Sequence, residues 1–335
     1  MTQIIFRRLI SIIPVILGMT ILTFALSHVV PADPARLLAG PRASAEVVEK
    51  IRHDNGLDKP IWRQYLSYMA GILRFDFGQS FSSFRPVRQD MAEYFPATAE
   101  LTIFALIFAV IVGVGVGILA AVRQDSWGDQ IGRFLSINGI SMPVFWLGLL
   151  AQLLLYQKLG WFPFGGRVGD EAILPPTVTG LLTVDCLIAG NWPTFLDAVQ
   201  HLILPAFVLG LEPLAILARI SRTSLIEVMR EPYIITARAK GLDQTLVIFR
   251  HAFRNALLPI VTVIGLLVGY LLSGSVMVET VFTWPGIGRY AARAISSADY
   301  SAVMGVTLVI SIIYLTSNLL VDLVYAKLDP RISFK

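Results

Sequence analysis

The chain has 335 residues, of which 55% are hydrophobic and only 15% are charged, whereas soluble domains are about one quarter charged. This composition excludes an ordinary soluble enzyme and indicates an integral membrane protein. The net charge of +4 does not indicate nucleic-acid binding, because basic residues in a membrane protein usually mark its cytoplasmic loops. We therefore expect no nucleic-acid partner. The single cysteine, Cys186, excludes an intramolecular disulfide.

The first apolar run extends from Leu9 to about Val30 and follows Arg7 and Arg8. A run of about 20 apolar residues can cross a hydrocarbon core of about 30 Å. The apolar region of a cleaved signal peptide is shorter and is followed by small residues at a cleavage site. The run is therefore predicted to be a retained transmembrane helix rather than a signal peptide.

Five more apolar segments bring the prediction to six transmembrane helices, which places both ends of the chain on one side of the membrane. Runs of this length are helices in a membrane, because lipid offers the backbone no hydrogen-bond partner. The predicted fold is an all-α integral membrane protein. The five segments are 97–122, 134–156, 201–218, 256–278 and 303–324.

The positions of Lys and Arg at the ends of these segments predict the orientation. Basic residues are concentrated in one set of loops, above all in 219–256, and are few in the opposite short loops. Loops rich in Lys and Arg face the cytoplasm, so both termini and 219–256 are predicted to be cytoplasmic. The chain then divides into a first helix with a long outer segment (1–96), a five-helix core (97–325) and a cytoplasmic tail (326–335).

The two outer segments contain polar and amphipathic sequence. Ser44 is a candidate N-cap for a helix that reaches His53, and 62–72 carries apolar residues at helical spacing. Both helices are expected to pack on the outer ends of the spans or to lie at the membrane surface. The second outer loop, 157–200, is rich in Pro, Gly and Trp.

Small residues and prolines within the spans indicate a helical bundle around an internal cavity. Gly113 and Gly117 are spaced for close contact between helices, as are Gly265 and Gly269. Prolines should bend the spans and free backbone carbonyls that need partners inside the protein. These prolines are Pro14, Pro143, Pro205 and Pro213.

The sequence contains no pattern for catalysis or metal binding. It has no P-loop and no Gly-Lys pair, so the chain itself does not bind ATP through a P-loop. It also has no HExxH pattern, and its four histidines are widely separated. The segment 286–291 matches GxGxxA but lacks the context of a dinucleotide site, and we interpret it as a turn at Trp284-Pro285-Gly286. We expect no catalytic residue, metal or cofactor in this chain.

Polar residues within the spans are the candidates for a solute pathway. Glu212 lies in the fourth span, where a carboxylate costs about 3 kcal/mol on insertion scales. It is expected either to line a cavity or to pair with a neighbouring helix. Asn138 and Ser141 in the third span are further candidates, although hydrogen bonds between helices would equally explain them.

The cytoplasmic stretch 231–259 has its own helix signals. Pro232 suits the first position of a short helix, Lys240 suits its last turn, and Gly241 suits a left-handed end. Asp243 is a candidate N-cap for a second helix that reaches Pro259, where the chain becomes apolar. The pattern predicts two helices separated by a break, which could lie on lipid or bind a partner.

The same stretch resembles the EAA loop of ABC importer permeases, and most of all that of the dipeptide/oligopeptide permease family. The resemblance rests on Thr236-Ala237-Arg238-Ala239-Lys240-Gly241 followed by Arg254-Asn255-Ala256-Leu257-Leu258-Pro259. Further motifs in the same order extend it over nearly the whole chain. They are Pro31-Ala32-Asp33-Pro34, Gly56-Leu57-Asp58-Lys59-Pro60, Phe77-Gly78-Gln79-Ser80, Ser141-Met142-Pro143-Val144-Phe145-Trp146, His201-Leu202-Ile203-Leu204-Pro205, Glu279-Thr280-Val281-Phe282-Thr283-Trp284-Pro285-Gly286-Ile287-Gly288 and Asp329-Pro330-Arg331-Ile332.

The resemblance implies a type I ABC importer permease of the bacterial inner membrane, multi-pass and in contact with lipid. In such importers a second homologous permease subunit completes the pathway, and two cytoplasmic ATPase subunits bind ATP and Mg. A periplasmic or lipid-anchored substrate-binding protein delivers the substrate. The resemblance implies import of dipeptides or short oligopeptides, and the loop 157–200 is similar to dipeptide-type members, those for D,D-dipeptides included. Nickel and glutathione permeases are the alternatives within the family.

The resemblance also implies a coupling helix that docks on an ATPase. Carried over to this chain, Ala237 and Gly241 would lie at the close contact. Ile235 stands where the general motif has Glu, which implies a more apolar contact. The implied coupling residues are Tyr233, Thr236, Ala237, Arg238, Ala239, Lys240 and Gly241.

Two other classes of function remain as alternatives. One is a self-sufficient secondary transporter or channel, which is disfavoured because the sequence has no obvious repeat and no relay of ionisable residues within the spans. The other is a membrane-anchored sensor or scaffold, in which the large outer segment would bind a ligand and no solute would cross.

Overall fold

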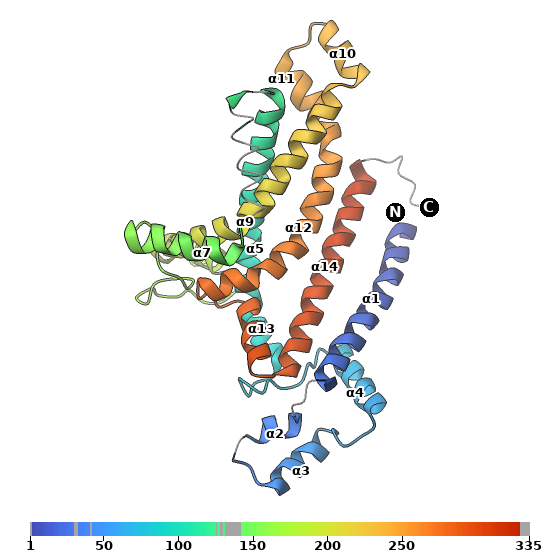
Figure 1. Cartoon of the computed structure of the whole chain (residues 1–335), viewed down its shortest axis with the longest axis vertical. Helices are drawn as coiled ribbons and strands as arrows, with labels where there is room; N and C mark the ends of the chain where they lie inside the picture. Colours follow the sequence, from blue (N-terminus) through green and yellow to red (C-terminus); the bar gives the residue numbers. More distant parts are fainter. Residues whose placement is uncertain are drawn as a thin grey trace. The chain divides into compact units, whose positions relative to one another are not determined.

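The structure, a computed structural model, describes residues 2–29, 33–40, 42–124, 126–127, 130 and 142–328. Its regular elements in these ranges are helices (Figure 1). The chain forms two compact units, which are described separately. The first unit comprises the described residues of 96–288 and 314–328, and the second comprises those of 2–95 and 289–313.

Three long helices build the first unit. α5 (Val87–Val122) enters it at Pro96, and α9 runs from Trp192 to Met229. α11 (Gln244–Leu246), η2 (Val247–Ala252) and α12 (Phe253–Val281) form one continuous helix, Gln244–Val281, of 38 residues. α9 and α12 pack along each other.

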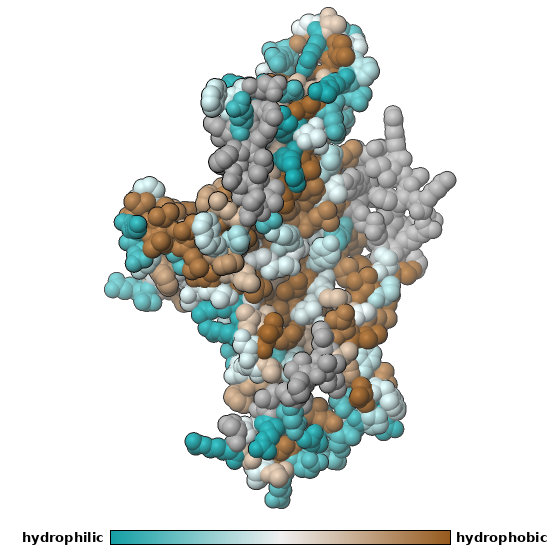
Figure 2. Space-filling view, viewed as in Figure 1, coloured by the Kyte–Doolittle hydropathy of each residue, from teal (hydrophilic) through white to brown (hydrophobic). Residues whose placement is uncertain are grey.

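Shorter helices complete this unit. α10 precedes α11, and Figure 1 places both at the far end of the long helices. Figure 2 shows hydrophobic residues over α7 and along α12, whereas the part that carries α10 and α11 is mainly hydrophilic. The shorter helices are α7 (Val144–Ala151), η1 (Gln152–Lys158), α8 (Leu182–Ile188) and α10 (Pro232–Ala239).

Four of the predicted spans are confirmed as long helices. Among the described residues, four helices are long and apolar enough to cross a membrane: α5, α9, Gln244–Val281 and the part Tyr300–Val321 of α14 (Tyr300–Leu328). Two shorter apolar helices, Ile10–Ala25 and Val144–Lys158, lie where the other two spans are predicted. The count of six spans stays a prediction.

Gly113 and Gly117 lie where α5 touches the backbone of α9, as their spacing predicts. A Cβ atom on Gly113 would lie 2.7 Å from the carbonyl oxygen of Leu214, and one on Gly117 would lie 2.6 Å from that of Ala218. No Cβ atom fits at such distances without a shift of one helix. The two glycines therefore set how closely α5 and α9 approach.

The second predicted pair, Gly265 and Gly269, also lies at a helix contact. Val321 of α14 faces Gly265, and the ring of Tyr314 faces Gly269. A Cβ atom at either position would overlap with these side chains. Both predicted glycine pairs are thus confirmed as sites of close contact.

Three of the four predicted prolines lie inside long helices, where the predicted bends stay a prediction, and the fourth lies at a helix end. Pro205 and Pro213 lie inside α9, which continues through both, and Pro14 lies inside α1 (Thr2–Val29). Pro143 does not bend a described helix: it occupies the N-cap of α7, which begins at Val144. Pro143 suits this place because the residue before a helix needs no helical hydrogen bond from its own N–H group.

The second unit contains α1 and three helices of the outer segment, α2 (Pro34–Ala39), α3 (Ala45–Asp54) and α4 (Ile61–Leu73). α3 begins at the predicted cap, where the Oγ atom of Ser44 accepts a hydrogen bond from the backbone N–H of Val47 at 3.4 Å. α4 covers the predicted apolar stripe at 62–72. Both predicted amphipathic helices are confirmed.

This unit also contains 289–313, which begins in α13 (Ile287–Ser296) and ends in α14. The Oη atom of Tyr290 donates to the Oδ2 atom of Asp90 at 3.0 Å, and the Oγ atom of Ser80 donates to the Oδ2 atom of Asp299 at 2.5 Å. These bonds join segments that are 200 or more residues apart in the sequence of the second unit. The predicted tail 326–335 and the motif at 329–332 lie mostly or wholly outside the described residues.

Candidate functional site

α10 forms with the caps that the sequence predicts. Pro232 occupies the first helical position. At the other end Gly241 has a φ of +74° and its N–H donates to the carbonyl oxygen of Arg238 at 2.9 Å. No atom lies within 4 Å of a Cβ atom placed on Gly241, so its left-handed backbone, and not the space around it, requires glycine here.

The inner face of α10 is fixed by Ile234. This side chain is fully buried among Leu225 of α9, Val247 and Ala252 of η2, and Ala256 of α12. The cluster thus gathers three neighbouring segments of the chain around α10. Burying an isoleucine of this kind contributes roughly 2 kcal/mol.

Ala237 packs against the same cluster as Ile234. The two residues are three positions apart in a helix and therefore lie on one face. Ala237 is only partly buried there, so part of its surface remains accessible, and the close contact with a partner that the resemblance implies stays a prediction. Gly241 is exposed, so its surface is open to a partner.

A hydrogen bond joins α10 to the start of the next long helix. The Nδ2 atom of Asn255 donates to the Oη atom of Tyr233 at 2.6 Å. It links the two halves of the stretch 231–259.

The second helix of this stretch begins at the predicted cap. The Oδ2 atom of Asp243 accepts from the backbone N–H groups of Thr245 at 2.8 Å and Leu246 at 3.3 Å. Hydrogen bonds from Thr245 and Leu246 lower the pKa of Asp243, so the cap stays ionised at neutral pH. Pro259, where the predicted helix meets the membrane segment, lies inside α12 and does not end the helix.

The outer face of α10 is exposed and mixes apolar and cationic groups. Ile235 is 58% exposed, and Thr236, Arg238, Ala239 and Lys240 are exposed beside it. We call the exposed residues Ile235, Thr236, Ala239 and Lys240 the α10 surface. Because Ile234 and Ala237 hold the helix from the other side, the α10 surface is presented in a fixed orientation.

Among the predicted pathway residues, Glu212 is placed by the structure. It accepts a hydrogen bond from the Oη atom of Tyr270 on α12, so it pairs with a neighbouring helix, and Tyr270 remains exposed on its other side. Asn138 and Ser141 lie outside the described residues. No cofactor site follows from these contacts.

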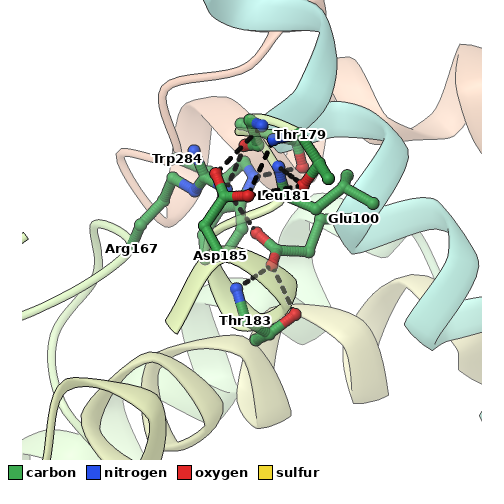
Figure 3. A network of polar contacts seen from close by, with 9 residues as sticks. Glu100, Arg167, Thr179, Leu181, Thr183, Asp185 and Trp284 are labelled. Atoms are coloured by element: carbon green, nitrogen blue, oxygen red, sulfur yellow. Dashed lines mark hydrogen bonds and ion pairs between the residues drawn. The ribbon is translucent and has the colours of Figure 1, made fainter. Parts of the chain in front are cut away.

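The sequence alone does not single out a buried cluster around Glu100 at one end of the α5 span. Glu100 is 2% exposed, and its Oε2 atom accepts from the Nη2 atom of Arg167 at 2.6 Å. Its Oε1 atom accepts from both the N–H and the hydroxyl of Thr183 at 2.7 Å. Figure 3 shows these side chains converging from α5, the loop after η1, and α8.

Asp185 of α8 forms the second half of this cluster. Its Oδ1 atom accepts from the N–H and the hydroxyl of Thr179 at 2.7 Å, and its Oδ2 atom accepts from the N–H of Gly180 at 3.0 Å. Burial alone would raise the pKa of Asp185, but the donors of Thr179 and Gly180 together lower it. Arg167 also donates to the carbonyl oxygen of Gly180 at 3.0 Å, so one network ties the loop 157–200 to α5.

Glu279 near the end of α12 is fully buried and organises a second group of contacts at α5. The Oγ1 atom of Thr98 donates to its Oε1 atom at 2.6 Å and accepts from the N–H of Ile287 at 2.8 Å. The indole Nε1 atom of Trp284 donates to the carbonyl oxygen of Ala97 at 2.9 Å. The motif 279–288 is therefore a tight turn around a buried carboxylate, which confirms that its GxGxxA pattern marks a turn.

A signal for these carboxylates exists in the sequence but is not specific. Glu100 and Glu279 stand at the ends of apolar spans, where acidic residues are also common as solvated ends. Their partners come from distant segments, Arg167 and Thr183 for Glu100 and Thr98 for Glu279. Only the fold brings these residues together.

Comparison with known proteins covers almost the entire chain. Residues 113–334 match the family described as binding-protein-dependent transport system inner membrane component, and residues 1–102 match the family described as its N-terminal membrane component.

Three relatives match along their full or nearly full length. A dipeptide transport system permease protein of Escherichia coli strain K12 is 46% identical over 100% of both chains. A probable D,D-dipeptide transport system permease protein of the same strain is 44% identical over 97% of this chain and 96% of its own. A glutathione transport system permease protein of Salmonella choleraesuis is 38% identical over 100% of both.

These matches agree with the apolar helices and with the motifs of the stretch 231–259. The chain is a multi-pass protein of the bacterial inner membrane and a permease component of an ABC importer. It belongs to the family of inner membrane components of binding-protein-dependent transport systems.

Proposed function

We propose that this chain carries dipeptides or short oligopeptides across the inner membrane as the permease subunit of an ATP-driven, binding-protein-dependent importer. The α10 surface is the feature of the structure that supports coupling of this chain to an ATPase. A short helix is anchored from inside by Ile234, and its outer face presents Ile235 to the surroundings at the end of the long helices. Such a rigid, exposed, partly apolar helix suits a groove on a partner protein.

The proposed assembly follows from the family. The chain forms six spans with both termini in the cytoplasm, and a second homologous permease subunit completes the pathway. Two cytoplasmic ATPase subunits bind ATP and Mg and dock on the coupling helices. A periplasmic or lipid-anchored protein delivers the substrate.

The proposed docking face differs from the general EAA motif in its chemistry. Ile235, Thr236 and Ala239 form the exposed side of α10, and Lys240 lies beside them at its end. An apolar contact at Ile235 would take the place of the acidic one in the general motif. Ala237 packs partly on the inner cluster and, with Gly241, stays a candidate for the close contact with the ATPase.

For the pathway we propose the face of α12 that includes Tyr270. Exposed residues recur at helical spacing along it, and Tyr270 and Ser273 make it polar in part. A face in contact with lipid would be apolar, whereas polar groups at membrane depth belong to protein or water. Glu212, hydrogen-bonded to Tyr270, would place its carboxylate at this face. Asn138 and Ser141 stay pathway candidates from the sequence.

The test is uptake by the complete transporter reconstituted in liposomes. Uptake of a labelled dipeptide should require ATP. Unlabelled dipeptide should compete with it, whereas nickel and glutathione should not. Ile235→Glu should reduce both copurification of the ATPase and uptake. The matched control is Ile188→Glu on α8, because Ile188 is 60% exposed and lies in another segment; its ATPase copurification should stay normal.

Three results would overturn parts of this proposal. Uptake by this chain alone, without ATP, would indicate a secondary transporter or channel. Competition by nickel or glutathione, but not by dipeptide, would replace the substrate. Normal uptake and ATPase binding in Ile235→Glu would remove the role of the α10 surface. In the same assay, Glu212→Gln should slow uptake while the ATPase still copurifies, and unchanged uptake would exclude Glu212 from the pathway.

A further inference from the structure

The helix α4 of the outer segment has three distinct faces. On a helix with 3.6 residues per turn, Tyr65, Tyr68 and Ile72 share one face. A second, neighbouring face carries Trp62, Leu66 and Leu73. The apolar part of the helix surface is therefore wider than the part that packs on α1. The third face carries Arg63, Ser67 and Arg74, which follows the last helical residue.

The first face packs on α1. The Oη atom of Tyr65 and the Oγ1 atom of Thr20 form a hydrogen bond at 3.0 Å. The ring of Phe24 lies 5.3 Å from that of Tyr65 and 5.9 Å from that of Tyr68, measured between centroids. These contacts fix α4 against one stretch of α1.

The contacts on α1 set the depth of α4. Thr20 and Phe24 lie in the apolar part of α1, Ile10–Ala25, and α1 ends at Val29. With a rise of 1.5 Å per residue, Thr20 and Phe24 are about 14 Å and about 8 Å below the end of the helix. If α1 spans the membrane, as the proposed topology has it, α4 lies beside the outer turns of a membrane helix.

The second face is apolar, and no described residue covers it. Trp62 is 59% exposed, Leu66 57% and Leu73 79%. Next to it the guanidinium carbon of Arg63 lies 5.0 Å from the centre of the Trp62 ring. A tryptophan with a neighbouring cation is typical of the boundary between lipid and water.

We propose that α4 lies in the outer interface of the membrane, with Trp62, Leu66 and Leu73 in the lipid and Arg63, Ser67 and Arg74 toward the headgroups and water. The proposed partner is the phospholipid bilayer. Two observations favour lipid over a protein: the packing face fixes α4 at membrane depth, and the exposed apolar face continues the face that packs on α1. The helix has no acidic residue, so its cations can meet lipid phosphates without competition within α4.

The proposal assigns α4 a role as an anchor. It would hold the outer segment 31–96 close to the membrane plane by burial of the second face, in addition to its contacts with α1. This role rests on the membrane topology proposed above but not on the identity of the substrate.

The proposal is tested with pairs of adjacent residues that lie on different faces of α4. Leu66→Cys and Ser67→Cys form one pair and Leu73→Cys and Arg74→Cys another, each made in a Cys186→Ala background because Cys186 is the one native cysteine. A nitroxide label is attached at each position, and the complete transporter is reconstituted in vesicles of phosphatidylethanolamine and phosphatidylglycerol. Collision rates with oxygen, which partitions into lipid, and with a water-soluble nickel chelate are then measured.

The expected result is a reversal within each pair. Labels at 66 and 73 should collide mainly with oxygen, and labels at 67 and 74 mainly with the nickel chelate, with a severalfold difference in the ratio. If labels at 66 and 73 meet the nickel chelate as readily as their neighbours do, the face is in water and the proposal is wrong. If they meet neither reagent, a protein subunit covers the face, which also overturns the proposal. If one pair fails to assemble, the other decides.

Discussion

The contact between Arg167 and Glu100 illustrates how one residue can hold an entire loop. Glu100 is buried at the end of the α5 span, and Arg167 neutralises its charge while also reaching the carbonyl oxygen of Gly180. Removing one member of a buried ion pair leaves the other charge without compensation, which costs about 3 kcal/mol or more. The pair therefore ties the loop 157–200 to the end of the α5 span.

We predict that Arg167→Met strongly destabilises the purified protein and makes the loop 157–200 more sensitive to protease. The double variant Arg167→Met with Glu100→Gln should recover part of the loss, because the uncompensated charge is then gone. Thermal unfolding in detergent measures both effects. Lys158→Met is the control, since Lys158 is exposed in the same loop and should change little. Equal melting of Arg167→Met and Lys158→Met would contradict this account.

At this scale the sequence predicts what depends on neighbours in the chain. Pro232, Gly241 and Asp243 act as helix ends through contacts within a few residues, and the structure confirms each. Glu100 and Arg167 are 67 residues apart, and no local pattern connects them. Glu212 is only partly predictable. A carboxylate within a predicted span is unusual, but the sequence does not identify Tyr270 as its hydrogen-bond partner.

Asp185 contributes to the stability of the folded protein, and its hydrogen bonds determine how this contribution depends on pH. Its pKa in the folded protein is lowered, so its contribution to stability is complete above the ordinary pKa of the side chain and is lost as pH falls through the lowered value. The contribution of Asp185 to the stability of the loop 157–200 should therefore persist in mild acid, which thermal unfolding at a series of pH values would measure.

Among the elements, the contact between α5 and α9 depends on glycine at defined positions. Gly113 and Gly117 touch the backbone of α9, whereas no atom lies within 4 Å of a Cβ atom placed on Gly115. The three glycines lie in one helix and differ in which of the described residues face them. Variants at these positions therefore distinguish the effect of helix packing on stability from the effect of helix propensity.

We predict that Gly117→Ala destabilises the bundle and that Gly115→Ala does not. In a helix, alanine is favoured over glycine by up to about 1 kcal/mol, so Gly115→Ala should be neutral or slightly stabilising. In Gly117→Ala the added methyl group forces α5 away from α9. Thermal unfolding and copurification of the subunits are compared for the two variants. A loss of stability in both, or in neither, would show that the contact does not set the packing.

The helices themselves are largely predictable because long apolar runs leave few alternatives in lipid. The predicted spans 97–122, 201–218 and 256–278 all lie inside longer helices of the structure, because the polar extensions at their ends lack the apolar signal but continue the backbone hydrogen bonds. The inner and outer faces of α10 were not predictable from its short sequence. Ile234 and Ala237 face inward because the cluster around Leu225 lies on that side.

At the scale of the molecule, segments distant in the sequence share one compact unit. The second unit combines 289–313 with the N-terminal segment, joined by Tyr290 with Asp90 and by Ser80 with Asp299. Burial, and then the neighbouring Asp90 carboxylate, raise the pKa of Tyr290, so its hydroxyl keeps its proton and continues to donate. Dividing the chain in sequence order does not reveal that 289–313 packs with the N-terminal segment, because no motif in either segment specifies this contact.

The predicted topology can be tested on the entire chain. With six spans, a fluorescent protein that folds only in the cytoplasm should be bright at both termini, and alkaline phosphatase, which needs the periplasm, should be active when inserted after Gly190 in the loop 157–200. Gly190 is exposed and follows α8, which makes it a tolerant insertion point. The same phosphatase inserted after Gly241 should be inactive. Brightness at one terminus only would mean an odd number of spans.

The continuous helix Gln244–Val281 has a mechanical consequence. Its 38 residues have a path length of about 57 Å along the helix, and Asp243 caps it at one end while Glu279 and Trp284 hold the other against α5. The helix is a continuous but curved rod (Figure 1), so its own backbone hydrogen bonds carry a displacement from one end toward the other. α10 contacts the first part of this rod through Ile234 and Asn255. A force on α10 therefore acts on the rod directly and does not depend on a series of side-chain contacts. It would arrive at the opposite side of the membrane as a displacement of the rod itself.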